Sequence, residues 1–346
     1  MRRMLRWLLL PWHAAALLTA SKDYRGNPLI GSVALNRRGL HVARARLAER
    51  MTQWRRRRLA PRIAPAERAQ FEDQGFVQRG DVLPPAQFTA LLAELRGLKV
   101  PMREMREGDA ITRRVIVTPE LLAGLPALRA LLESPAWRDT LRYVAGSAAE
   151  PLIYVQTILS HAAPAAEADP QTALHMDTFH PNMKAWFYLQ DVAAEVGPLA
   201  YVPGSHRLTP RRLAWERARS VIAAKGRVGG AFRVTEAELP RLRLPPPRRL
   251  AVPANTLVVA DVRGFHARSR TEQASMRVEI YAISRPNPYL PLLRGPADWW
   301  PALARRRARL HLLLHDALAR LSLARPVWHE ARPGSPFDPP EGKATP

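Results

Sequence analysis

The central part of the chain, residues 151–284, is dominated by short apolar stretches rich in β-branched and aromatic residues. Pro and Gly turns separate these stretches, and they do not alternate with helices in a βαβ pattern. Such a pattern favours an antiparallel sandwich or barrel. The expected strands cover residues 152–159, 184–191, 199–202, 256–262 and 277–283.

The regions on either side differ from this centre in composition. From Pro61 the pattern predicts a helix, a short strand around 76–77, a turn at Pro84 and Pro85, and a second helix. The fold class is therefore mainly β with flanking helices. The expected parts are residues 1–60, a basic amphipathic extension; 61–292, the main domain; and 293–346, an amphipathic helix with a loose tail from Arg332.

The chain is strongly basic, with 53 Lys and Arg against 30 Asp and Glu, a net charge of +23. Residues 1–60 hold 14 of the basic and 2 of the acidic residues. A basic excess attracts anionic partners such as nucleic acid, anionic lipid or a CoA-type thioester. No zinc-finger spacing or aromatic RNA-binding signature accompanies it, so nucleic acid is the least favoured of the three.

The N-terminal extension has features that favour contact with a membrane surface. Its apolar stretch, residues 7–20, is shorter than the about 20 residues that span a bilayer, and no convincing signal-peptide cleavage site follows. Residues 40–59 predict an amphipathic helix, and the arginines at 55–58 are expected on a solvated face. We therefore expect a cytoplasmic protein, peripheral at an anionic membrane; a helix packed on its own domain is the alternative. The apolar face of the helix would consist of Leu40, Ala43, Leu47, Met51 and Trp54.

Two histidines and an aspartate lie within the ten residues TALHMDTFHP, 172–181. The chain has no cysteine, so a metal ion would have to be held by His, Asp or Glu. His175 and Asp177, at positions i and i+2 of a strand, would project to the same face and could bind one ion. This pair alone is a weak signal, because ten histidines among 30 acidic residues give about one such pair by chance.

A metal site of the two-histidine, one-carboxylate type requires another histidine on a neighbouring strand. His180 is disfavoured, because it lies five residues after His175 and therefore on the opposite strand face. His266 is favoured, because it follows a buried apolar strand and a glycine, where a sheet presents a side chain at a pocket mouth. Arg277 opens the next strand, and a buried arginine there needs an anion, which a dicarboxylate cosubstrate would supply.

Four features, taken in order along the chain, resemble those of one enzyme family. They are FEDQGFVQRGDVLPP (71–85), HMD (175–177), GPLAYVPGSHR (197–207) and the pair His266 and Arg277. The combination resembles the phytanoyl-CoA dioxygenases among the Fe(II)/2-oxoglutarate oxygenases. The resemblance covers roughly residues 65–290, and the ordered set is far more specific than any single motif.

This resemblance implies a double-stranded β-helix, the jelly-roll or cupin-like fold. It implies that His175, Asp177 and His266 hold Fe(II) as the catalytic centre, with 2-oxoglutarate and O2 as cosubstrates. Arg277 would bind the distal carboxylate of 2-oxoglutarate, and Gln156 would provide a further polar contact to it. The presence of Asp177 favours hydroxylation over halogenation, because related halogenases leave the carboxylate position vacant for chloride.

Some positions depart from the family pattern or have simpler interpretations. Arg268 stands two residues after the distal histidine, where a small hydroxyl residue is common, and Ser269 follows it; this affects secondary cosubstrate contacts, not the iron ligands. His206 is interpreted as a turn or supporting residue, and His161 and His180 as loop residues. Loops at 103–115 and 207–248 are expected to shape the substrate pocket.

The leading functional hypothesis is a hydroxylase acting on a small molecule that is anionic, acyl or lipid-like. A catalytically inactive, membrane-associated binding or scaffold protein with the same fold is the alternative. The intact set of His175, Asp177, His266 and Arg277 counts against that alternative, because an inactive site would be free to lose any of them.

Overall fold

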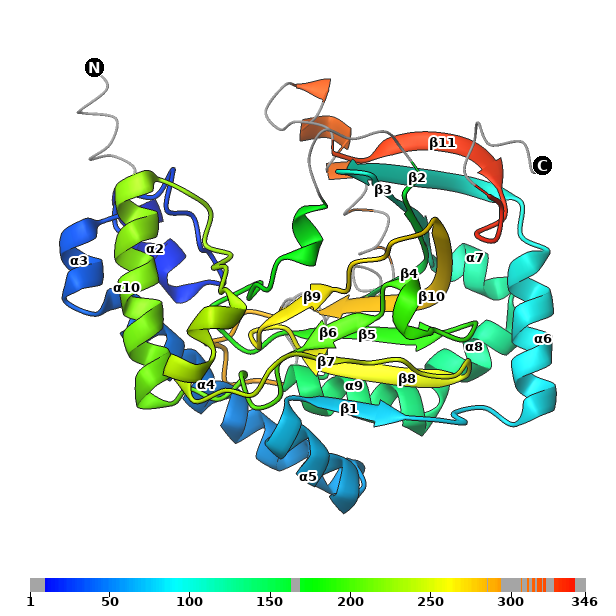
Figure 1. Ribbon diagram of the computed structural model, residues 1–346, viewed down its shortest axis with the longest axis horizontal. Helices are drawn as coiled ribbons and strands as arrows, with labels where there is room; N and C mark the ends of the chain where they lie inside the picture. Colours follow the sequence, from blue (N-terminus) through cyan, green and yellow to red (C-terminus); the bar gives the residue numbers. More distant parts are fainter. Residues whose placement is uncertain are drawn as a thin grey trace.

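The chain folds around two antiparallel β-sheets (Figure 1). The computed structural model describes residues 10–162, 169–284, 286–293 and 327–339, and a few positions between 306 and 321. The main sheet has the order β1-β8-β5-β10-β4-β3-β2-β11 and the second sheet the order β7-β6-β9. Their bounds are β1 Phe76–Arg79, β2 Val100–Glu107, β3 Ala110–Ile116, β4 Leu152–Ser160, β5 Met183–Tyr188, β6 Leu199–Tyr201, β7 Arg248–Arg249, β8 Thr256–Asp261, β9 His266–Arg268, β10 Ser275–Ser284 and β11 His329–Gly334.

Each central strand of the main sheet alternates between two environments. On β10, Val278 and Ile280 pack in a core under helices, whereas Tyr281 packs with residues of the second sheet. This alternation follows from the two-residue period of a strand. Two antiparallel sheets with helices on one outer face confirm the expected jelly-roll fold. The covering helices are α5 Pro65–Gln74, α6 Pro85–Arg96, α7 Pro119–Ala123, α8 Pro126–Glu133 and α9 Pro135–Ala145.

The helix ends follow local sequence signals. The Ser134 hydroxyl accepts a hydrogen bond from the Trp137 backbone N–H at the start of α9, and Pro135 occupies the first turn. Gly146 ends the helix with φ of 57°, a left-handed conformation that suits glycine. Short 3₁₀ helices cover Ala16–Leu18, Ala60–Arg62, Pro170–Thr172, Ala194–Val196, Glu236–Glu238 and Pro240–Leu242.

A second group of helices gathers at one end of the sheets, opposite α6, α7 and α8 (Figure 1). The group consists of α2 Leu10–Ala15, α3 Val33–Arg37, α4 Leu40–Leu59 and α10 Pro210–Gly226. Helix α4 has the bounds that the sequence predicts, and it packs on α9 and α10. The N-terminal segment is therefore in close contact with the β-sheet region.

One part of the prediction for α4 was wrong. Leu47 and Trp54 point outward, with exposed fractions of 43% and 37%, whereas Arg55 and Arg56 are buried. Arg55 donates hydrogen bonds to the carbonyl oxygens of Gly146 and Pro288. The expectation of a solvated arginine face was thus wrong for two of the four arginines, because backbone carbonyls and a carboxylate in the core accept their hydrogen bonds.

The predicted strands of the central region are all present, but two other expectations were wrong. Residues 103–115, expected as a loop, lie mostly in β2 and β3, and 207–248 contains α10. Part of the tail, expected to be loose from Arg332, forms β11, which pairs with β2. The amphipathic helix expected within 293–346 lies largely outside the described residues. Whether the three predicted parts are separate domains stays a prediction.

Among the helices of the described ranges, none combines sufficient length with sufficient apolar character to cross a bilayer.

Candidate metal centre

The site begins with a backbone pairing between two histidines. His175 donates its N–H to the His266 carbonyl oxygen and accepts from the His266 N–H, each at 3.0 Å. His266 opens β9, while His175 is a single bridged residue rather than part of a longer strand. The reciprocal pairing places the two imidazole centroids 4.6 Å apart.

Both imidazoles are oriented by backbone carbonyl oxygens. His175 Nδ1 lies 2.8 Å from the Ala173 oxygen, and His266 Nδ1 lies 3.0 Å from the Gly264 oxygen. A carbonyl oxygen only accepts, so each Nδ1 carries the proton and each Nε2 keeps its lone pair. The Nε2 of His266 is buried and has no hydrogen-bond partner among the described residues. An unpartnered buried nitrogen is costly unless a ligand such as a metal ion satisfies it.

Asp177 completes the set. Its Oδ1 lies 3.5 Å from His175 Nε2 and 3.8 Å from His266 Nε2. One ligand atom from each residue lies within 4.8 Å of the others, and no further His, Cys, Asp or Glu of the described residues joins the group. Donors about 2.1 Å from a shared ion can be at most about 4.2 Å apart, so small shifts bring all three onto one metal. The three residues fit a mononuclear metal ion.

The electrostatic environment keeps His266 and Asp177 in their metal-binding forms. Burial, followed by the neighbouring His175, lowers the pKa of His266 to about 3, so its imidazole is neutral. Burial raises the pKa of Asp177, but the Lys184 ammonium at 2.7 Å opposes this effect, and that pKa lies well below its usual range. A metal ion requires neutral imidazole and ionised carboxylate, so neither His266 nor Asp177 has to release a proton at neutral pH when a metal binds.

Arg277 and Gln156 meet at one buried carboxylate. Arg277 Nε donates to Glu279 at 2.9 Å, and Gln156 Nε2 donates to the other Glu279 oxygen at 2.6 Å. Arg114 donates to Gln156 Oε1 at 2.6 Å, and Arg277 Nη1 donates to the Gly197 carbonyl oxygen. Arg277 is thus paired inside the protein, and its Nη2 has no hydrogen bond among the described residues.

The remaining histidines do not join the metal group. His180 is buried and contacts the Pro181 carbonyl oxygen at 2.9 Å. His206 lies in a turn and packs against the Phe71 ring at 5.4 Å. His161 pairs with Asp109 at 2.7 Å. Arg268, which departs from the family pattern, forms an ion pair with Asp169 at 2.7 Å. This carboxylate is the partner that the buried Arg268 guanidinium requires.

Three charged residues near the site were not singled out in the sequence. Lys184 binds the Asp177 carboxylate at 2.7 Å, Lys22 donates to the Asp177 carbonyl oxygen, and Glu279 pairs with Arg277. Lys184 and Glu279 could have been noticed, because each is a charged residue within an otherwise apolar strand. Lys22 carries no such signal, since it lies in an irregular segment far away in sequence.

Two imidazoles and one carboxylate on a jelly roll define a mononuclear metal site of the type that non-haem iron oxygenases use. The phytanoyl-CoA dioxygenase (PhyH) family matches residues 71–229 of the chain, which confirms the resemblance expected from the motifs. This range includes His175 and Asp177, whereas His266 and Arg277 lie beyond it. Among curated proteins, no sequence matches the chain.

Several solved structures are similar to this chain. The non-heme alpha ketoglutarate dependent epimerase SnoN from nogalamycin biosynthesis is 22% identical, covering 63% of this chain and 81% of its own, with a TM-score of 0.42. HygX from Streptomyces hygroscopicus, solved with nickel and 2-oxoglutarate, is 17% identical, covering 65% and 87%, with a TM-score of 0.42. The carbocyclase SnoK is 20% identical, covering 64% and 83%, with a TM-score of 0.39. The named activities are those of these proteins.

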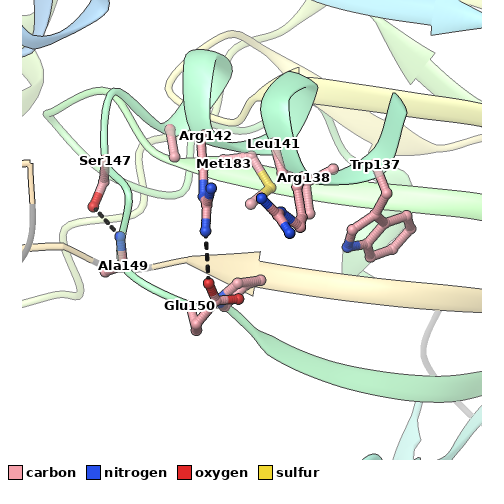
Figure 2. Close-up of a pocket in the computed structure, with 10 residues that line it drawn as sticks. Trp137, Arg138, Leu141, Arg142, Ser147, Ala149, Glu150 and Met183 are labelled. Atoms are coloured by element: carbon pink, nitrogen blue, oxygen red, sulfur yellow. Dashed lines mark hydrogen bonds and ion pairs between the residues drawn. The ribbon is translucent and has the colours of Figure 1, made fainter. Parts of the chain in front are cut away.

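A surface pocket lies elsewhere, beside the end of α9 (Figure 2). Trp137 and Arg142 line it from α9, and Glu150 closes one side through an ion pair with Arg142 at 2.9 Å. Met183 contributes from the helix-covered face of the sheet. None of the metal-site residues lines this pocket, so it does not belong to the candidate centre.

Proposed function

We propose that this protein is a non-haem Fe(II)/2-oxoglutarate-dependent dioxygenase that hydroxylates a small molecule. The observation that carries the proposal is the convergence of His175, Asp177 and His266, with the buried His266 Nε2 left unpartnered. Iron, 2-oxoglutarate and O2 would together supply the oxidising chemistry for inserting oxygen into a C–H bond. The match to the PhyH family supports this type of function.

The residues of the chain would bind, orient and shield the reactants. The three ligands would hold the metal, and their carbonyl and lysine partners would fix each donor atom. Arg277, already oriented by Glu279 and Gly197, would offer Nη2 to a carboxylate of the cosubstrate. Gln156 is hydrogen-bonded to Arg114 and Glu279, so its contribution would be to orient Glu279, which in turn orients Arg277.

The substrate would be anionic, acyl or lipid-like. Arg114 supports this proposal, since it lies at the centre of an aromatic group with its Cζ 4.9 Å from the Tyr154 ring, 4.7 Å from Tyr281 and 4.6 Å from Trp328. Cations held against aromatic faces combine an apolar surface with positive charge. Such a surface suits a ligand with both an apolar body and an anionic group.

The test is anaerobic addition of Fe(II) and 2-oxoglutarate to the purified full chain. We expect a weak visible charge-transfer band in the wild type, its loss in His175→Ala, and its weakening in Arg277→Ala. Slow succinate formation from 2-oxoglutarate in air, without substrate, would give a second readout. A folded, iron-supplied wild type that shows neither signal would exclude the proposed activity.

The outward face of α4 supports peripheral contact with an anionic membrane. Leu47 and Trp54 are exposed there, Arg58 stacks on the Trp54 ring at 3.6 Å, and Arg46 and Arg50 are exposed alongside. We expect sedimentation with phosphatidylserine vesicles and little binding to phosphatidylcholine vesicles.

The matched pair for that experiment is Leu47→Ser/Trp54→Ser against Ile222→Ser, since Ile222 is 56% exposed on α10. Only the α4 variant should lose vesicle binding. Vesicle binding at the wild-type level by both variants would exclude α4 as the contact. Vesicle binding without any 2-oxoglutarate turnover would favour the inactive binding or scaffold protein.

A further inference from the structure

Two lysines converge on the single carboxylate ligand of the candidate metal centre. Lys184 Nζ lies 2.7 Å from Asp177 Oδ2, and Lys22 Nζ donates to the Asp177 backbone carbonyl oxygen. We propose that Lys184 and Lys22 are positioning residues that hold Asp177 so that Oδ1 faces the two histidines. The inference rests on the proposed metal site and extends it to two further residues, of which Lys184 lies within the matched family range and Lys22 outside it.

The Lys184 contact divides the two carboxylate oxygens between different partners. Oδ2 binds the ammonium group, while Oδ1 is the atom that approaches both Nε2 atoms, at 3.5 and 3.8 Å. Lys184 lies on β5, where its backbone pairs with Ala260 of β8 and Ile283 of β10. A lysine on a central strand is a fixed anchor, so the carboxylate cannot rotate freely about its Cβ–Cγ bond.

The Lys22 contact ties the N-terminal segment to the same residue. Gly230 lies so close to this segment that a Cβ built there would be 2.7 Å from Lys22 Cβ. The loop that follows Gly230 is in turn bound to the ligand segment, because Met176 donates its N–H to the Phe232 oxygen at 2.9 Å. Lys22, this loop and the segment 175–177 therefore contact one another.

The choice of lysine over arginine supports a positioning role. The chain uses lysine only at positions 22, 99, 184, 225 and 343, and the other 48 of its 53 basic residues are arginine. Two of the five lysines thus contact Asp177. An arginine at 184 could bind both carboxylate oxygens in a bidentate fork and would withdraw Oδ1 from the metal, whereas an ammonium group binds one oxygen and leaves the other free.

Charge and orientation predict opposite effects of removing Lys184, which makes the proposal testable. An ammonium group near a divalent cation repels it, so the loss of charge alone would tighten metal binding. The loss of orientation would weaken it, because partners of metal ligands typically contribute about 10- to 100-fold in affinity. The proposal requires the second effect to dominate.

In the experiment, the full, metal-free chain is titrated with Co(II) alone. Calorimetry measures the affinity, and the visible d–d spectrum of the ion reports its coordination. We expect wild type to bind one equivalent, and Lys184→Met to bind about 10- to 100-fold more weakly with an altered spectrum. Lys184→Arg keeps the charge but should also bind more weakly, because its fork competes for Oδ1. Lys225→Met, in the last turn of α10, is the control and should match wild type.

Each outcome decides a separate point. If wild type fails to bind Co(II), the proposed metal site is wrong. If wild type binds and the two Lys184 variants bind equally well or more tightly, the positioning role is wrong. Lys22→Met changes a segment outside the sheets, so it keeps the proposal testable if the β5 variants misfold. It should weaken Co(II) binding while its thermal unfolding stays cooperative. Wild-type affinity in this variant would overturn the role of Lys22.

Discussion

His175 and His266 exchange both of their backbone hydrogen bonds, each at 3.0 Å, although they lie far apart in the sequence. The strand pairing therefore holds the two imidazoles close together. Each ring is also oriented by a carbonyl oxygen through Nδ1. The protein thus preorganises two ligands before a metal arrives, which reduces the ordering required on binding.

Removing one ligand of this pair should abolish metal binding. We expect His266→Ala to weaken Co(II) or Fe(II) affinity by more than the roughly 100-fold that supporting partners contribute, because it removes a donor itself. His161→Ala is the control, since His161 pairs with Asp109 away from the metal group. Calorimetric titration measures both. Retention of full affinity in His266→Ala would exclude it as a ligand.

The backbone before His266 leaves no room for a side chain at Gly264. A Cβ built there would lie 1.9 Å from the hydroxyl oxygen of Tyr201, which is buried and bonded to the Asp261 carbonyl oxygen at 2.8 Å. We expect Gly264→Ala to lower the free energy of unfolding by about 1–3 kcal/mol through overpacking.

Gly80→Ala is the matched control, because nothing lies within 4 Å of a Cβ at Gly80. Urea denaturation of the two variants should therefore separate them. Gly264→Ala should also weaken metal binding, since the Gly264 carbonyl orients His266. Equal stability of both variants would show that the Tyr201 ring moves aside without cost.

The strands of the core could be predicted from sequence because period-two alternation between two apolar environments leaves a local pattern. The stretch 277–283 illustrates this, with Val278 and Ile280 under the helices and Tyr281 facing the second sheet. The metal group was predictable for a different reason. His175, Asp177 and His266 are residue types that a cysteine-free chain needs for a metal, arranged in an order that resembles a known family.

The burial of two arginines on α4 could not be read from the sequence in the same way. The apolar stripe of this helix, including Leu47 and Trp54, faces outward, and Arg56 is buried because Asp261 and carbonyl oxygens accept its hydrogen bonds. Those acceptors come from distant parts of the chain, so the hydropathy pattern of the helix does not indicate them. The contact of Lys22 with Asp177 was missed for the same reason.

The four successive arginines at 55–58 should therefore differ sharply in their effect on stability. Arg56 Nη2 lies 3.0 Å from Asp261, and the guanidinium stacks on the Phe71 ring at 4.5 Å. Arg56→Met would leave a buried carboxylate without its cation, which typically costs about 3–5 kcal/mol. Arg57→Met, on the exposed side, should change stability by less than about 0.5 kcal/mol.

Denaturant unfolding of this pair of variants measures the difference directly. Since the two substitutions are chemically identical and adjacent, effects of helix propensity and net charge largely cancel. A similar loss of stability in both would mean that the basic run acts through its overall charge. A loss confined to Arg56→Met would establish that the N-terminal helix is anchored in the core.

His180 predicts how stability depends on pH. Burial lowers its pKa from 6.5 to about 4. Between these values the unfolded chain binds the proton and the folded chain does not, so stability is fully present above pH 6.5 and is lost as pH falls toward 4. The loss attributable to this residue is roughly 2 kcal/mol between pH 7.5 and 5.

The variant His180→Asn keeps a nitrogen donor for the Pro181 carbonyl oxygen but does not titrate, so its stability should fall less steeply than that of wild type over this interval. Burial and nearby arginines hold the pKa of His206 well below its usual range, so His206 contributes in the same direction, and the comparison has to be the difference between the two proteins in urea denaturation at each pH. Parallel pH profiles would show that His180 becomes protonated without unfolding, through access of water to its ring.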